Sequence, residues 1–144
     1  MIVYIIPRMT ATDKIIRDLQ ATDRAVRNAA ALRLIDAKAV DAIPALTDAI
    51  RNTEHIGANG TLVYALGHFD CSSHFGLLVA VALRHEFEAS LEARKILTEH
   101  DLVLQDDQLA ECRRFIDSLD VNGLTEFQRA ALVEIRERFF GEGL

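Results

Sequence analysis

Apolar residues recur at helical spacing along most of this chain. Between residues 23 and 50 they form two short amphipathic stretches separated by a turn, and residues 57–83 repeat that arrangement. A shift of 34 residues places Ala31-Leu32 on Ala65-Leu66 and Asp36 on Asp70. A self-match at this period is typical of helical hairpins that bury their apolar faces against neighbouring hairpins. The pattern therefore predicts an all-α fold, an α-solenoid of about seven to eight helices.

The same periodicity predicts where the helices begin and which side of each is buried. We expect Ala25, Ala29, Leu32 and Ile35 to form the buried stripe of the second helix. The fifth helix is apolar nearly all round and should lie at the centre of the stack. The expected helices cover approximately residues 12–20, 23–35, 41–50, 60–69, 73–83, 87–99, 106–119 and 125–140.

Polar residues at the expected helix starts suggest caps. The candidates are Thr12 or Asp13 for the first helix, Asp41 for the third, Ser72 or Ser73 for the fifth, and a Thr125–Gln128 capping box for the last. Pro44 then falls in the first turn of the third helix, where its missing N–H is harmless. Gly60 is expected where two backbones approach each other.

Length and composition indicate one domain over residues 1–144, with residues 1–9 peripheral or poorly ordered. The longest apolar run, Phe75–Leu83, is far shorter than the ~20 residues that cross a bilayer. No signal-peptide pattern is evident, and Cys71 and Cys112 are expected to be buried, unpaired thiols. These features favour a cytoplasmic protein.

The formal net charge is −6, and the negative charge lies in the C-terminal two-thirds of the chain. Residues 53–144 hold sixteen acidic and eight basic side chains. Such a field repels nucleic-acid phosphates and anionic membranes and attracts basic proteins. We therefore expect a protein partner, with no nucleic acid and no membrane.

Ten carboxylates crowd into residues 86–120, and this cluster has two interpretations. It is either a docking surface for a basic partner or a solvated helical face, with two aspartates placed favourably near a helix N-terminus. The ten are Glu86, Glu88, Glu92, Glu99, Asp101, Asp106, Asp107, Glu111, Asp117 and Asp120.

His68-x-x-Cys71-x-x-His74 offers two imidazoles and a thiolate, to which His55 or Asp70 would add a fourth zinc ligand. Residues across a helical corner often point apart, and this spacing differs from ordinary zinc motifs, so we assign no metal and no cofactor. No motif for acyl transfer, phosphate binding or metalloprotease chemistry occurs in the chain. We therefore predict that the protein is not an enzyme.

The first repeat resembles the HEAT repeat, in the short bacterial variety first noticed in phycobilisome lyases. The matching residues are Val26-Arg27, Ala29–Leu32, Asp36, Ala39-Val40 and Ala42–Leu46, whereas the second repeat keeps only Tyr64–Gly67 and Asp70. The resemblance implies stacked helix pairs whose second members line a concave face. These would be the third, fifth and seventh helices.

Among stand-alone bacterial domains of this type, the chain resembles immunity proteins that neutralise secreted or contact-delivered toxins. The expectation is a cytoplasmic protein that covers a basic toxin domain with an acidic concave face. The residues expected to contact the partner are Asp70, His74, Asp101, Asp107 and Glu111. The alternatives are a scaffold or regulatory subunit of another complex, or a lyase-like enzyme.

Overall fold

The computed structural model describes residues 8–52 and 57–142, and within these ranges it contains helices and no strand. The all-α prediction is therefore confirmed. The α-helices are α1 (Ala11–Leu19), α2 (Arg24–Ala37), α3 (Ile43–Arg51), α4 (Gly60–Leu66), α5 (Phe75–Arg84), α6 (Phe87–Glu99), α7 (Asp106–Asp117) and α8 (Glu126–Phe140). Short 3-10 helices, η1 (Val40–Ala42), η3 (Ser72–His74) and η4 (Val121–Gly123), lie in the connections.

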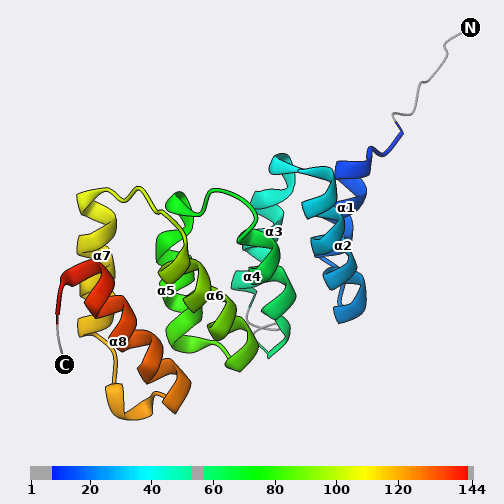
Figure 1. Ribbon diagram of the computed structural model, residues 1–144. Helices are drawn as coiled ribbons and strands as arrows, with labels where there is room; N and C mark the ends of the chain where they lie inside the picture. The colour runs from blue at the N-terminus through cyan, green and yellow to red at the C-terminus, as the bar shows by residue number, and fades with distance from the viewer. Residues whose placement is uncertain (1–7, 53–56, 143–144) are drawn as a thin grey trace, which may run out of the picture.

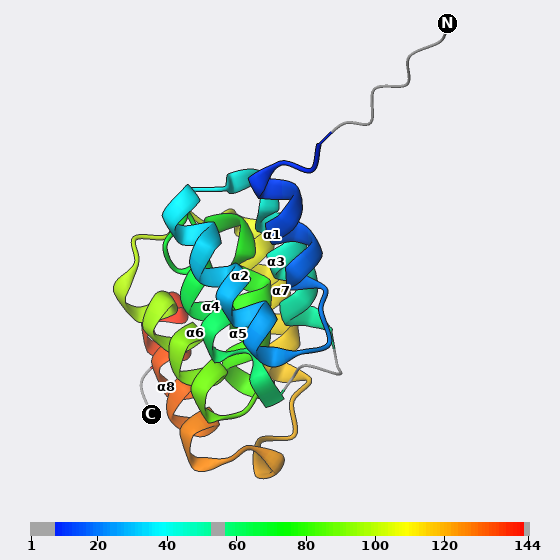
Figure 2. The same ribbon diagram turned by 90° about the vertical axis from the view of Figure 1, so that its right-hand side faces the viewer.

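The helices are arranged in two layers that follow the chain from one end of the molecule to the other (Figure 1). Helices α2, α4, α6 and α8 pack successively on one another, and we call them the even layer. Helices α1, α3, α5 and α7 form the odd layer, in which α1 contacts α3 and α5 contacts α7. Figure 2, turned by 90°, shows α3 and α7 on one side of the molecule and α4, α6 and α8 on the other.

The contacts between the layers correct the predicted helix pairing. Between the layers, α1 contacts α2, α3 contacts α4, and α5 contacts both α6 and α8. The first three of these pairs are offset by one helix from the pairs expected at 23–50 and 57–83. The left-handed residue Lys38 and the short helix η1 separate α2 from α3. A shift of 34 residues places α2 on α4, both in the even layer, and α3 on α5, both in the odd layer.

Helix α5 lies at the centre of the core, as its composition predicts. It contacts α6, α7 and α8, and Phe75, Leu78 and Val81 are fully buried. Phe75 meets Phe139 of α8 edge to face, with 4.9 Å between the ring centroids. These contacts hold the C-terminal helices on the rest of the molecule.

The predicted buried side of α2 is wrong. Ala25, Ala29 and Leu32 are exposed, whereas Ala30, Ala31 and Leu34 are buried together with Arg27. Alanines lie on several sides of this helix, so the apolar spacing does not distinguish one face from another. The register is set instead by contacts with α1 and α4.

The caps were predicted correctly at some helices and not at others. Thr125 and Gln128 form the expected capping box of α8, and Gly141 ends that helix with φ 61°. Helix α1 begins earlier than predicted, because Thr10 and Asp13 form a capping box there. The N-terminus of α3 has no side-chain cap, since η1 occupies the turn that Asp41 was expected to close. Neither Ser72 nor Ser73 caps α5.

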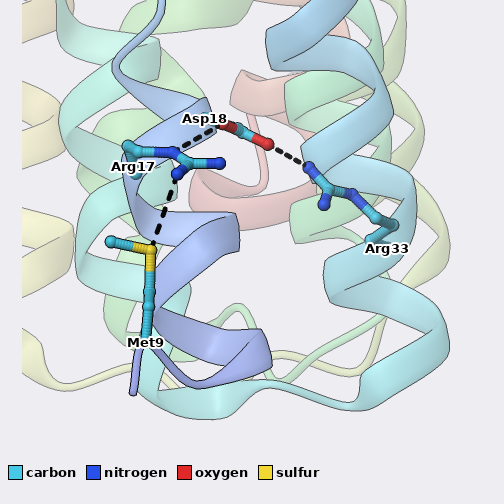
Figure 3. Close-up of polar contacts among 4 residues, drawn as sticks. All are labelled: Met9, Arg17, Asp18 and Arg33. Carbon is cyan, nitrogen blue, oxygen red and sulfur yellow. Dashed lines mark hydrogen bonds and ion pairs between the residues drawn. The ribbon is translucent and has the colours of Figure 1, made fainter. Parts of the chain in front are cut away.

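Polar contacts tie neighbouring helices together. Asp18 of α1 accepts a hydrogen bond of 2.6 Å from Arg33 of α2, and Arg17 reaches both Asp18 and the sulfur of Met9 (Figure 3). In the even layer, a side chain at Gly60 of α4 would lie 2.9 Å from the Cβ of Glu88 in α6. Glycine is therefore required at this close approach of α4 to α6, as predicted.

Residues 1–7 of the N-terminal segment predicted to be peripheral lie outside the described ranges, and Arg8 and Met9 are exposed. None of the helices in the ranges 8–52 and 57–142 combines the length and the apolar composition needed to cross a bilayer.

Candidate partner-binding surface

Hydrogen bonds stabilise the turn between α4 and α5. The Asp70 carboxylate accepts a hydrogen bond of 3.0 Å from the backbone N–H of Ser72. That hydrogen bond lowers the pKa of Asp70, so the side chain keeps its charge at neutral pH. The buried Cys71 thiol lies 3.2 Å from the carbonyl oxygen of Leu66. The turn therefore presents Asp70 to solvent from a fixed backbone.

Two hydrogen bonds fasten this turn to the start of α7. The hydroxyl of Ser72 accepts from the backbone N–H of Val103 at 2.9 Å, and its carbonyl accepts from Nε2 of Gln108 at 2.7 Å. Gln108 also forms a capping box with Gln105 at the N-terminus of α7. Segments about thirty residues apart in the chain are thus held side by side.

This junction gathers carboxylates, and we call Asp70, Asp101, Asp106, Asp107 and Glu111 the acidic edge. All five are exposed. The part of the chain that the structure describes places no lysine, arginine or histidine within ion-pairing distance of them. Asp107 accepts a hydrogen bond from the backbone N–H of Gln108, at the end of α7 where the helix dipole favours negative charge. The acidic edge is therefore a set of fixed, unneutralised charges.

A groove adjoins the acidic edge on the odd layer, and we call it the odd-layer groove. Its volume is about 380 Å³, and α3, α5 and α7 all contribute to its walls. His74 and Glu111, both predicted as contact residues, line this groove together with Arg51. Burial lowers the pKa of His74, and the nearby Arg51 lowers it further, against a smaller opposing effect of Asp70. His74 is therefore neutral at neutral pH.

No family model matches this chain, and no curated protein or solved structure is significantly similar to it.

The ten acidic residues of the predicted cluster do not share one surface. Glu88 and Glu92 lie on α6 in the even layer, where they form ion pairs with Arg24 and Lys95. Asp107 and Glu111 lie on α7 in the odd layer, without such partners in the ranges 8–52 and 57–142. The predicted cluster is therefore divided between ion-paired carboxylates on α6 and carboxylates without ion pairs at the start of α7, and its role as a docking surface stays a prediction.

The residues considered for zinc binding point in different directions. His68 packs against the Tyr64 ring on α4, with 4.7 Å between the ring centroids, whereas His74 lines the odd-layer groove. Cys71 is buried between them, and burial raises the pKa of its thiol to about 11. Among the described residues no group of three suitable side chains surrounds a possible metal position, and His55 lies outside those residues.

Some residues of this surface were not predicted to belong to it, although Ser72 was predicted as a helix cap. Gln108 and Ser72 join the two halves of the acidic edge, and Arg51 and Gly76 line the odd-layer groove. Neither a glutamine in an acidic segment nor a glycine early in an apolar helix marks a site on its own. Their roles depend on contacts between segments distant in the chain, which no local pattern encodes.

Proposed function

We propose that this chain is a protein-binding module of the HEAT-like helical-repeat type that acts as a cytoplasmic immunity protein. In this proposal it neutralises a basic toxin domain by covering it with the acidic edge and the odd-layer groove. The role requires no catalysis and no cofactor. The stacking of equivalent helices, α2 with α4 in one layer, supports the solenoid description.

The observation that carries the proposal is the unpaired charge of the acidic edge. Gathering exposed carboxylates without cations disfavours the folded state through mutual repulsion. Other carboxylates, such as Glu88, Glu92 and Glu134, have an arginine or lysine partner. A basic partner removes this repulsion on binding and is drawn to the surface at long range. The hydrogen bonds of Ser72 with Val103 and Gln108 join the Asp70 turn to the start of α7, so these charges are held together before the partner binds.

The test begins with the neighbouring reading frames. An immunity gene should lie just downstream of a gene for a large secreted protein, and the C-terminal domain of that protein is the binding probe. We expect this domain to bind the chain and to lose affinity as salt is raised, because exposed charges are screened. The absence of binding to that domain would contradict the immunity role.

Charge-reversal variants test whether the acidic edge is the surface that binds the toxin domain. We expect Asp101→Lys with Glu111→Lys to weaken binding by more than about tenfold at low salt. Asp107 is left unchanged, because its carboxylate also stabilises the start of α7. The matched control is Glu99→Lys with Glu137→Lys, which alters the net charge equally at exposed positions near helix C-terminal ends. Equal losses in both variants would show that only overall charge matters and that the acidic edge is not the surface.

A scaffold or regulatory subunit is the second candidate, and a groove on the even layer favours it. This groove has a volume of about 480 Å³, and its walls include the exposed side chains of Leu32 and Tyr64. A scaffold that holds two proteins needs two such surfaces. Tyr64→Ala would then weaken assembly of a second protein while leaving binding at the acidic edge unchanged.

A further inference from the structure

Gly76 is the second residue of α5, and nothing inside the molecule requires a glycine there. A Cβ at this position would meet no atom within 4 Å, and the backbone is not left-handed. Glycine forms helices less well than alanine. The residue therefore weakens α5 without any internal packing that explains it. Gly60, by contrast, is a glycine that close packing demands.

The open space beside Gly76 belongs to the odd-layer groove. Its volume of about 380 Å³ lies at the lower end of the range of small-ligand pockets, which suits a single inserted side chain. Gly76 and Ala80 have little or no side chain, so α5 leaves space in the groove at these positions. Leu77 and Phe115 contribute apolar surface to the groove. A larger residue at position 76 would project into this space.

The chemistry of the groove favours a long cationic side chain. Apolar walls accommodate an aliphatic stem, and the carboxylate of Glu111 lies at the same groove without a cation of its own in the described ranges. Phe115 lines the groove, and its ring already has the guanidinium of Arg84 at 4.7 Å from its centroid, so it is a ring that packs with an arginine in this molecule. Arg51, the cation on the groove wall, lies 3.8 Å from the Asp48 carboxylate.

We propose that the odd-layer groove receives one arginine or lysine side chain of the basic partner, and that Gly76 is the residue that keeps the space open. The inserted head group pairs with Glu111 while its stem lies along Leu77 and Phe115. This inference rests on the proposed function, because it identifies the part of the partner that the surface recognises.

The first test uses a defined probe. N-acetyl-arginine methylamide is titrated into the labelled protein and followed by amide NMR, with the isosteric neutral citrulline compound as control. We expect shifts at Gly76 and Phe115 with arginine alone, loss of these shifts in Gly76→Leu, and binding about threefold weaker in Glu111→Gln. Shifts confined to Asp101 and Asp107, or no shifts, would overturn the inference.

The second test separates the groove from the proposed function. Gly76→Leu should weaken binding of the toxin domain by about tenfold, since it fills the groove and leaves every charge in place. If this variant binds as tightly as the wild type while the Asp101→Lys, Glu111→Lys protein does not, the groove inference fails and the proposed function stands. If both variants bind normally, both proposals fail.

The melting temperature of a third variant, Gly76→Ala, tests whether the glycine at position 76 is needed for folding. Gly76→Ala should raise the Tm by about 2 °C, because alanine strengthens the first turn of α5 and meets no neighbour. A lower Tm in Gly76→Ala would mean that the glycine serves the fold and not the partner.

Discussion

Arg27 is a buried cation whose removal should reveal how much its contacts with the α1–α2 connection stabilise the fold. Its side chain is 2% exposed. Its Nη1 atom donates to the carbonyl oxygen of Ala21 at 3.0 Å and to that of Thr22 at 2.8 Å, two residues that follow α1. No carboxylate in the described ranges pairs with it, and its Nε has no partner. The guanidinium therefore joins α2 to the α1–α2 connection through these two hydrogen bonds.

The expected loss of stability follows from these contacts. Each carbonyl loses a charged donor, at roughly 1.5 kcal/mol for each hydrogen bond. Truncation to alanine also removes stem methylenes from the core, at about 0.8 kcal/mol each. Relief from burying an unpaired cation offsets part of the loss. We expect Arg27→Ala to lower the free energy of unfolding by about 3 kcal/mol, and Arg27→Met, which keeps the stem, to lower it by about 1 kcal/mol.

Urea unfolding followed by circular dichroism measures both values. Arg24→Ala is the control, because Arg24 lies on the same helix with its side chain 59% exposed and should change stability by less than about 0.5 kcal/mol. If Arg27→Ala lowers the free energy of unfolding no more than Arg24→Ala does, water replaces the guanidinium and its hydrogen bonds do not stabilise the fold. If Arg27→Met costs as much as Arg27→Ala, the stem contributes nothing and the hydrogen bonds carry the whole effect.

Two further predictions concern the C-terminal half. Burial lowers the pKa of His85 below its ordinary value of 6.5. The unfolded chain therefore takes up a proton at a higher pH than the folded protein. The free energy of unfolding should fall as the pH drops below 6.5, and this fall should end below the pKa of the folded state. His85→Phe should flatten this fall in urea titrations across that window, and an unchanged slope would assign it to other groups. Arg94 and Glu134 join α6 to α8 through two side-chain hydrogen bonds. A double-mutant cycle with Arg94→Met and Glu134→Gln should give a coupling of about 1 kcal/mol, and a coupling near zero would make the pair incidental.

The helices themselves were predictable from the sequence, because their signals are local. The cap of α8 needs only Thr125 and Gln128, three residues apart, and the buried residues Leu46 and Ile50 of α3 follow from helical spacing. The buried side of α2 was not predictable in the same way. Its alanines allow several faces to pack, and the buried Arg27 donates to carbonyl groups of the α1–α2 connection, which lies outside the helical pattern.

The candidate site was predictable in its residue types and not in its assembly. Negative charge at Asp107 and Glu111 follows from composition, and the structure places Glu111 beside His74 at one groove. The joining of the Asp70 turn to α7 depends on hydrogen bonds of Ser72 with Val103 and Gln108. A sequence alone does not show which carboxylates acquire cationic neighbours, so it could not separate the α6 face from the acidic edge.

The order of the helices in the two layers has a kinetic consequence. Extensive contacts join helices that are at most three positions apart in the chain, so only short stretches of polypeptide must close before packing begins. Chains dominated by such nearby contacts fold quickly, and we expect the α5–α6 pair, which has the most extensive contacts, to form early. The central helices of a newly synthesised chain would then fold first, and the helices near its two ends would pack onto them afterwards.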